Sequence, residues 1–304
     1  TAAPTSTTTT AAPPDTTTTA TTTATPAVTT TPPVTTPPVA ITTATGVVLP
    51  VIGREGDRFR VAMPCEGTAL AQGTPVGPVT VVLDPGHGGT ERGAVATSGL
   101  EEKAVNLAVA KQAQAVLVGA GVPTVLTRSG DYGMTLAARA GLVMALRPKA
   151  FVSIHHNSDP DGPRATPGTE TYYQVAAPDS KRLAGLIYEE VTKALAQFSG
   201  PWVADTDAGA KYRRGSTGDD YYAILRRTHG VPSALGELAF ITDPSEAALL
   251  AQPDVQAAEG QAVARGITRF LSTKDPGSGF TVPYPRTEPA GGGGGTEGCV
   301  NPVL

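Results

Sequence analysis

Thr80-Val-Val-Leu-Asp-Pro-Gly-His-Gly-Gly89 is an apolar, β-branched run that leads directly into a glycine-rich loop. This pattern predicts a buried strand that delivers the loop at its C-terminal end. Apolar residues then recur at helical spacing over 101–120, and Gly119 and Gly121 stop the helix. A second β-branched run at 123–128 predicts another strand. The order strand, helix, strand is typical of an α/β unit with parallel strands.

The same alternation continues to residue 271. The periodicity predicts helices over 135–146, 180–198 and 254–271, and strands over 150–155, 168–174 and 233–240. We therefore expect an α/β fold with a mostly parallel, twisted sheet flanked by helices on both faces. Open sheets of this class place their sites outside the carboxyl ends of the strands. The segment 199–220 has no clear period and is predicted to be a loop that borders the site.

Four segments divide the 304 residues. Residues 1–43 are almost entirely Thr, Ala and Pro and are interpreted as a disordered stalk, either O-glycosylated or an unmodified spacer. Residues 44–78 predict a small β-hairpin segment that packs on the α/β domain after it. That domain is expected over 79–273, and residues 274–304 form a glycine-rich C-terminal tail.

Cys65 and Cys299 flank the predicted catalytic domain. A single disulfide is the favoured interpretation, and two free thiols are the alternative. The sequence has no apolar run near the ~20 residues that span a bilayer and no signal peptide at its start, so we interpret it as a mature form whose export signal is already absent, and the stalk favours export. We expect it to be secreted, in the cell wall or periplasmic space. The net charge of −4 argues against a basic nucleic-acid binder.

Three residues at strand and helix ends form a candidate zinc site. His87 stands in the glycine-rich loop, Glu102 opens the next helix, and His155 ends a later strand. Two histidines and one carboxylate with a vacant fourth position are the usual ligands of a hydrolytic zinc ion. Zinc lowers the pKa of bound water to about 7, and a further carboxylate must accept the proton. Glu237 is the candidate because it is the only charge in an otherwise apolar strand.

Each of these residues also has a structural interpretation. His87 would satisfy loop hydrogen bonds, Glu102 would interact with a helix N-terminus, and Glu237 would pair with a buried arginine such as Arg139. His229, in Thr228-His-Gly, is interpreted as a loop residue and not as a ligand.

Seven motifs in order resemble the zinc-dependent N-acetylmuramoyl-L-alanine amidases of the amidase 3 group. They are Val82-Leu-Asp-Pro-Gly-His-Gly-Gly, Glu102-Lys103 with Asn106-Leu107, Leu126-Thr-Arg, Leu136 with Arg139-Ala140, Ser153-Ile-His, Gly168-Thr-Glu-Thr-Tyr-Tyr and Pro232-Ser-Ala-Leu-Gly-Glu-Leu-Ala-Phe. The resemblance covers residues 79–272 and implies zinc bound by His87, Glu102 and His155, with Glu237 as the catalytic carboxylate. The composition of the stalk makes an actinobacterial or mycobacterial-type wall amidase the expected nearest relative.

The sequence departs from the family pattern at two positions. His156 stands where the family usually has a small residue, and Gly236 replaces an apolar residue. Neighbouring strand residues point to opposite faces, so His155 and His156 are not expected to bind one metal ion together. His156 is interpreted as a surface residue or as a residue behind the ligands, with a substrate contact as the alternative.

The resemblance implies a peptidoglycan hydrolase that cleaves the amide between N-acetylmuramic acid and the L-alanine of the stem peptide. We expect peptidoglycan as substrate, Zn²⁺ as cofactor, no nucleic acid, no transmembrane segment and a monomer. Arg213 and Arg214 are expected to meet the acidic stem. Two alternatives stay open: a zinc peptidase that cuts within the stem peptide, and a catalytically silent wall-binding or regulatory protein of the same fold.

Overall fold

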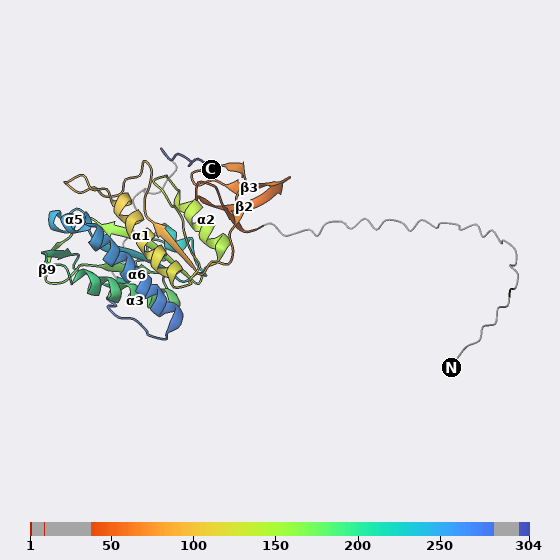
Figure 1. The fold of residues 1–304 in the computed structure, drawn as a ribbon. Helices are drawn as coiled ribbons and strands as arrows, with labels where there is room; N and C mark the ends of the chain where they lie inside the picture. Colours follow the sequence, from red (N-terminus) through yellow and green to blue (C-terminus); the bar gives the residue numbers. More distant parts are fainter. Residues whose placement is uncertain (2–8, 10–37, 283–297) are drawn as a thin grey trace. The chain divides into compact units, whose positions relative to one another are not determined.

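The computed structural model describes Thr1, Thr9, residues 38–282 and residues 298–304. The chain divides into two units, Thr1–Thr36 and Pro37–Leu304. All the helices and strands of the described residues belong to the second unit (Figure 1). Most of the predicted stalk, and the glycine run of the predicted tail, lie outside the described residues.

A six-stranded sheet forms the centre of the second unit, in the order β12-β10-β13-β8-β6-β7. Its strands are β6 (Val81–Pro85), β7 (Thr124–Leu126), β8 (Ala150–Asn157), β10 (Glu170–Tyr173), β12 (Ala210–Lys211) and β13 (Ser233–Phe240). Neighbouring strands pair in parallel except β10 and β13, which are antiparallel. The predicted mostly parallel sheet is confirmed.

Helices cover both faces of this sheet, as predicted. They are α1 (Glu102–Gly119), α2 (Leu136–Leu146), α3 (Pro178–Leu195), α4 (Ala223–Arg226), α5 (Pro244–Leu250) and α6 (Pro253–Ser272). Helices α1, α6 and α3 lie side by side (Figure 1) and share one core that includes Val109, Leu183 and Val263. Helices α2 and α4 contribute Val143 and Ile224 to a second core on the opposite face.

The segment predicted as an irregular loop contains regular structure. Besides β12, it includes β11 (Trp202–Ala204), which pairs with β9 (Gly162–Arg164) in a separate two-stranded sheet. Strands of two or three residues are too short to show an alternating pattern, which is why the sequence did not reveal them.

A second, antiparallel sheet precedes the central one. Its strands are β1 (Ala40–Thr42), β2 (Val48–Glu55), β3 (Arg58–Ala62), β4 (Thr68–Ala71) and β5 (Thr74–Pro75), in the order β4-β3-β2-β1-β5. The predicted hairpin is present as β2 and β3. Strand β1, however, lies within the residues interpreted as stalk, and Ala40 and Ile41 are fully buried. Threonine is β-branched and suits strands, so a Thr-rich composition does not by itself mark the end of a stalk.

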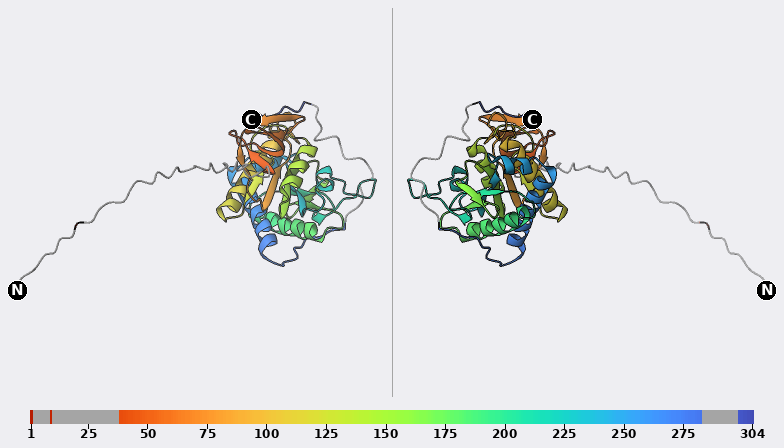
Figure 2. Two further views of the ribbon diagram at one scale, coloured as in Figure 1. Left: turned by 90° about the vertical axis from the view of Figure 1, so that its right-hand side faces the viewer. Right: turned by 90° about the vertical axis from the view of Figure 1, so that its left-hand side faces the viewer.

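The predicted disulfide between Cys65 and Cys299 is present and joins residues 234 positions apart. Beside it, the backbone N–H of Cys65 donates to Oδ1 of Asn301 (2.8 Å). The C-terminal residues therefore lie beside the antiparallel sheet, as both views in Figure 2 show. The hydroxyl of Thr90 donates to the carbonyl of Gly298 (2.8 Å), so the same residues also contact the loop that includes His87.

Replacing Cys299 with serine is expected to lower the free energy of unfolding by about 2–5 kcal/mol, because the bridge restricts a long loop in the unfolded chain. Urea unfolding of the wild type and of Cys299→Ser measures the difference. Wild type under reducing conditions is the matched control and should unfold at the same urea concentration as the variant. An unchanged midpoint for Cys299→Ser would show that the bridge does not stabilise the fold.

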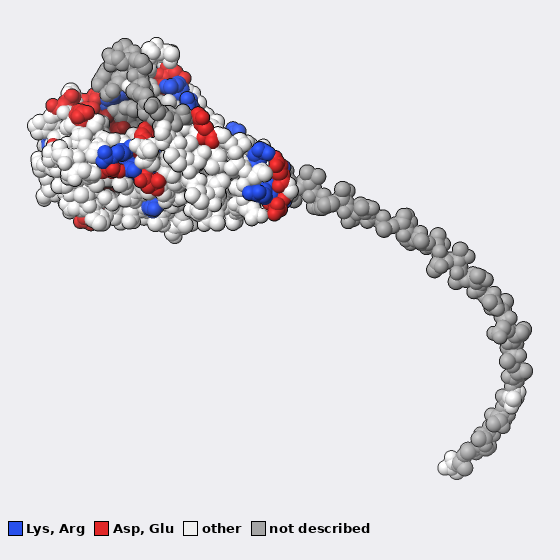
Figure 3. Space-filling view, turned by 90° about the horizontal axis from the view of Figure 1, so that it is seen from above, with Lys and Arg blue, Asp and Glu red and all other residues white. Residues whose placement is uncertain are grey.

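Charges of both signs are interspersed over the face of the molecule in Figure 3. Adjacent opposite charges largely cancel at a distance, so the described part of that face has no extended field of one sign. Within the described residues, none of the helices combines the length and apolar character needed to cross a membrane.

Candidate metal centre

The loop after β6 holds His87 in a conformation that few side chains adopt. The φ of His87 is 61°, in the left-handed region, where non-glycine residues are uncommon and often functional. Arg139 fixes this loop by donating to the carbonyl oxygens of Pro85 (2.7 Å) and His87 (2.6 Å). Gly86 leaves room for the second histidine, since a Cβ at Gly86 would lie 2.1 Å from Cε1 of His155.

Glu102 is the first residue of α1, and its side chain turns away from the helix to face the histidines. The backbone N–H of Ala94 donates to Oε2 of Glu102 (2.9 Å). Gly93 lies against the same carboxylate: its φ is +70°, and a Cβ there would lie 2.4 Å from Oε2. Glu102 also lies in the first turn of α1, where a carboxylate interacts favourably with the helix dipole, so its place at the helix N-terminus is compatible with a role in the cluster of histidines.

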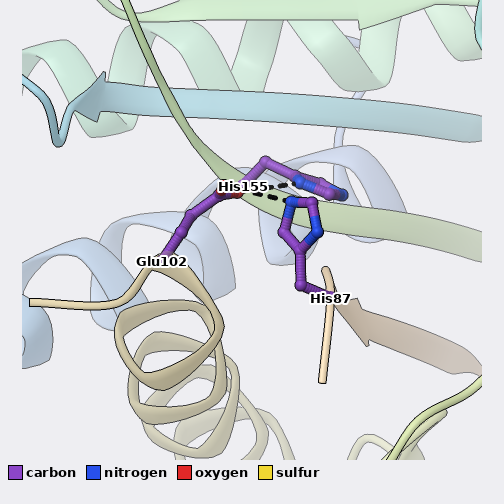
Figure 4. A group of neighbouring side chains, drawn as sticks. All are labelled: His87, Glu102 and His155. Carbon is purple, nitrogen blue, oxygen red and sulfur yellow. Dashed lines mark hydrogen bonds and ion pairs between the residues drawn. The ribbon is translucent and has the colours of Figure 1, made fainter. Parts of the chain in front are cut away.

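His87, Glu102 and His155 converge at the carboxyl end of the parallel strands (Figure 4). Nε2 of His87 lies 3.0 Å from Oε2 of Glu102, and Nδ1 of His155 lies 3.0 Å from Oε1 of Glu102. One potential ligand atom from each of the three residues lies within 4.8 Å of the others. We call these residues the His–Glu–His cluster. The three side chains predicted from the sequence as zinc ligands are thus brought together.

The electrostatics of the His–Glu–His cluster favour an anionic carboxylate between two imidazoles. Burial raises the pKa of Glu102, but hydrogen bonds from His155 and His87 outweigh it and hold the pKa well below its usual value. Burial lowers the pKa of His155. Burial also opposes protonation of His87, yet hydrogen bonds to Glu102 and Glu91 raise its pKa to about 9. Two imidazoles and one carboxylate are the donors that zinc prefers, so the residues present fit that ion.

Glu237 lies next to the His–Glu–His cluster on β13. Its Cα pairs in register with that of His155 on β8 and with that of Glu170 on β10. The residue is half-buried, and its Oε2 is buried without a hydrogen-bond partner among the described residues. Burial, followed by the negative charges of Glu102 and Glu170, raises the pKa of Glu237 well above its usual value. Such a carboxylate binds a proton more readily than an exposed one.

The alternative interpretation paired Glu237 with a buried arginine such as Arg139, but Arg139 does not pair with Glu237. Instead, Arg139 Nη1 donates to Oδ1 of Asp84 (2.7 Å), and both side chains are buried. Burial raises the pKa of Asp84, but Arg139 and hydrogen bonds from Thr127 and Ser153 outweigh it, so the pKa is lowered. The Asp84–Arg139 pair therefore anchors the His87 loop and leaves Glu237 free of a nearby arginine partner on α2.

A buried group of charges beside Glu237 was not recognised from the sequence. Lys211 Nζ lies 3.2 Å from Oε2 of Glu170 and 2.8 Å from Oδ1 of Asp207, and the Lys211 and Glu170 side chains are fully buried. Arg213 is also buried and lies 3.4 Å from Oδ2 of Asp207. The expectation that Arg213 meets the substrate is therefore wrong, because its guanidinium contacts Asp207 and Glu170. Arg214 is exposed.

The other two histidines, His156 and His229, lie outside the His–Glu–His cluster, as expected from the sequence. His156 faces away from the His–Glu–His cluster, and its side chain is fully buried against Glu259. The alternative of a substrate contact does not fit a buried ring. His229 is about half exposed, and its Nε2 lies 2.8 Å from Oδ2 of Asp220.

Residues 81–269 match the sequence profile of a family described as N-acetylmuramoyl-L-alanine amidase. The uncharacterized protein YqiI of Bacillus subtilis is 35% identical over 209 residues, which are 68% of this chain and 90% of YqiI. The N-acetylmuramoyl-L-alanine amidase LytC of the same organism is 35% identical over 199 residues, 64% of this chain and 36% of LytC. The chain thus spans nearly all of one relative and about a third of the other.

Solved structures agree with these sequence relatives. The N-acetylmuramoyl-L-alanine amidase AmiC2 of Nostoc punctiforme aligns with a TM-score of 0.54 at 31% identity, covering 64% of this chain and 98% of AmiC2. Ami1 of Mycobacterium smegmatis has the same fold, with a TM-score of 0.54 at 22% identity over 64% of this chain and 98% of Ami1. The similarity therefore extends across several bacterial groups.

Proposed function

The chain belongs to the N-acetylmuramoyl-L-alanine amidase family that its residues 81–269 match, and from this premise we propose how its residues divide the work of a zinc-dependent peptidoglycan hydrolase. His87, Glu102 and His155 hold the zinc ion, and Glu237 is the catalytic carboxylate. One observation carries the assignment: the ligand atoms of these three residues lie within 4.8 Å of one another at the carboxyl edge of the sheet. Zinc bound there supplies a Lewis acid that activates water and polarises the scissile carbonyl.

Glu237 moves the proton in this proposal. A general base must lie close to the attacking water, and the register of β13 with β8 puts Glu237 beside His155. Its Oε2, which is buried and has no hydrogen-bond partner in the part of the chain that the structure describes, is available to accept that proton. The water oxygen bonds to the lactyl carbonyl carbon, the carbon–nitrogen bond breaks, and Glu237 passes the proton to the leaving amine of L-alanine. The neighbouring Glu170 adds negative charge, which favours uptake of the proton.

The family and the disulfide support a proposal on where the protein acts and on what it acts. The family acts on peptidoglycan, and a disulfide is typical of oxidising compartments, which supports a site of action outside the cytoplasm. Secretion, a monomeric state, the absence of nucleic-acid binding and the domain boundaries at 43, 78 and 273 stay predictions. So does a mycobacterial-type affinity, although the M. smegmatis structure is less similar to this chain (22% identity) than the Nostoc one (31%).

Mass spectrometry of purified muropeptides, incubated with the protein with and without a zinc chelator, tests the proposal. We expect free stem peptides that begin with L-alanine, alongside saccharides that keep the lactyl group, and none of either with chelator. Fragments cut within the stem would indicate a zinc peptidase. Bound zinc without any product would indicate a catalytically silent wall-binding protein. Either result would overturn the proposed reaction.

A further inference from the structure

A buried chain of side chains leads from Glu102 to helix α6. Asn106, one turn along α1 from Glu102, donates from Nδ2 to Oε1 of Glu102 (3.1 Å). Oδ1 of Asn106 lies 2.7 Å from Nδ1 of His156. Nε2 of His156 lies 3.3 Å from Oε2 of Glu259, and the side chains of both residues are fully buried.

The surroundings of Asn106 fix the direction of its hydrogen bonds. Besides Glu102, its Nδ2 faces the carbonyl oxygen of Gly86 at 3.3 Å. Both neighbours are acceptors, so the amide must present its NH₂ group to them. The flipped orientation would place Oδ1 against two oxygens. Oδ1 therefore faces His156, and Nδ1 of His156 must carry the hydrogen that Oδ1 accepts.

Glu259 completes this arrangement at the other ring nitrogen. Nδ1 of His156 carries the hydrogen that faces Asn106. A second hydrogen lies between Nε2 and the Glu259 carboxyl group, so the ring is held at both ends. A buried histidine and carboxylate cost more desolvation free energy than apolar side chains of the same volume would. The neighbouring core between α1 and α6 consists of apolar side chains such as Val109, Ala113 and Val263. Packing alone therefore does not require a polar pair at this place.

The end point of the chain is the carboxylate that faces both histidines of the His–Glu–His cluster. Oε1 of Glu102 is held by Nδ2 of Asn106 and also by the backbone N–H of His156 (3.2 Å). A ligand carboxylate that accepts such bonds has less freedom to rotate, and partners of this kind tune metal affinity.

We propose that His156 and Glu259, acting through Asn106, are positioning residues that orient the Glu102 carboxylate for metal binding. This inference rests on the proposed role of Glu102 as a zinc ligand. In the arrangement, Glu259 locks the His156 ring, His156 locks the Asn106 amide, and Asn106 directs one oxygen of Glu102.

Two substitutions of similar size at Glu259 separate positioning from packing. Glu259→Gln can donate its amide hydrogen to Nε2 and so keep the Nδ1 hydrogen directed at Asn106. Glu259→Leu leaves Nε2 without a partner, so the ring is held only at Nδ1, by Asn106. We expect Glu259→Leu to weaken zinc binding by about 10- to 100-fold, and Glu259→Gln to stay within about threefold of wild type.

Zinc affinity is measured on the purified full-length protein by competition with a chromogenic chelator, and the visible spectrum of the cobalt-substituted protein reports ligand geometry. Val191→Ala, a cavity in the buried part of α3, controls for general destabilisation. Equal zinc affinity in Glu259→Leu and Glu259→Gln, or an equal loss in Val191→Ala, would overturn the proposal. If Glu259→Leu does not fold, His156→Ala takes its place with the same expectation. Wild type that binds no zinc would refute the zinc site itself, whereas wild type that binds zinc with an unaffected Glu259→Leu would refute only the positioning.

Discussion

Glu237→Gln is expected to lower amidase turnover by at least about 100-fold while zinc content stays at the wild-type level. Glutamine keeps the shape of the side chain but cannot accept the proton of the attacking water. The melting temperature should be equal or slightly higher. Burial and the charges of Glu102 and Glu170 disfavour the Glu237 anion, and the substitution removes that anion.

Turnover is measured by release of L-alanine-terminated stem peptides, and zinc by elemental analysis of the same preparation. Glu66→Gln makes the same chemical change at an exposed position and should leave both values unchanged. Near-normal turnover in Glu237→Gln would refute the role of general base. Loss of zinc together with turnover would make Glu237 a ligand and remove Glu102 or His155 from the proposed set.

The candidate site was largely predictable because its residues lie at the ends of elements with strong periodic patterns. The run that ends at Pro85 placed His87 in a loop, and the strand that includes Ser153 placed His155 at the same edge of the sheet. Parallel strands bring their carboxyl ends together, so residues far apart in sequence met as expected. The single charge in an otherwise apolar strand marked Glu237, whose Cα pairs in register with that of His155.

Other features depend on partners that a linear pattern does not show. The charge group around Lys211 could not be read from the sequence, because Glu170, Asp207 and Lys211 meet only when β10 and β12 pair. A run of charged residues usually indicates a solvated loop, and that general tendency led to the wrong expectation for Arg213. The partner of His156 was equally hidden, since Glu259 lies 103 residues away on α6.

The boundary of the folded unit shows a different limit. Composition separates a Thr-rich stalk from a globular domain only on average, and β1 consists of Ala-Ile-Thr. Its burial depends on pairing with β2 and β5, which are formed by later residues. Local composition cannot report that pairing.

His87→Ala is expected to weaken zinc binding by more than about 100-fold, since loss of a partner behind the ligands alone costs about 10–100-fold. The substitution removes one of two imidazoles and leaves His155 and Glu102, a set with too few donors to hold zinc tightly. His229→Ala is the matched control: His229 is likewise next to carboxylates, Asp219 and Asp220, but lies outside the His–Glu–His cluster.

Chelator competition and elemental analysis give zinc affinity and content for both variants, and circular dichroism confirms that each is folded. The His87 ring is held by side-chain contacts with Glu102 and Glu91, and the loop itself by Arg139, so the fold should survive its removal. Full zinc retention in His87→Ala would exclude His87 from the metal centre. Zinc loss in His229→Ala instead would move the centre to the Asp219–Asp220–His229 group, because that group is the other one among the described residues in which histidine and carboxylate ligand atoms lie within 4.8 Å of one another.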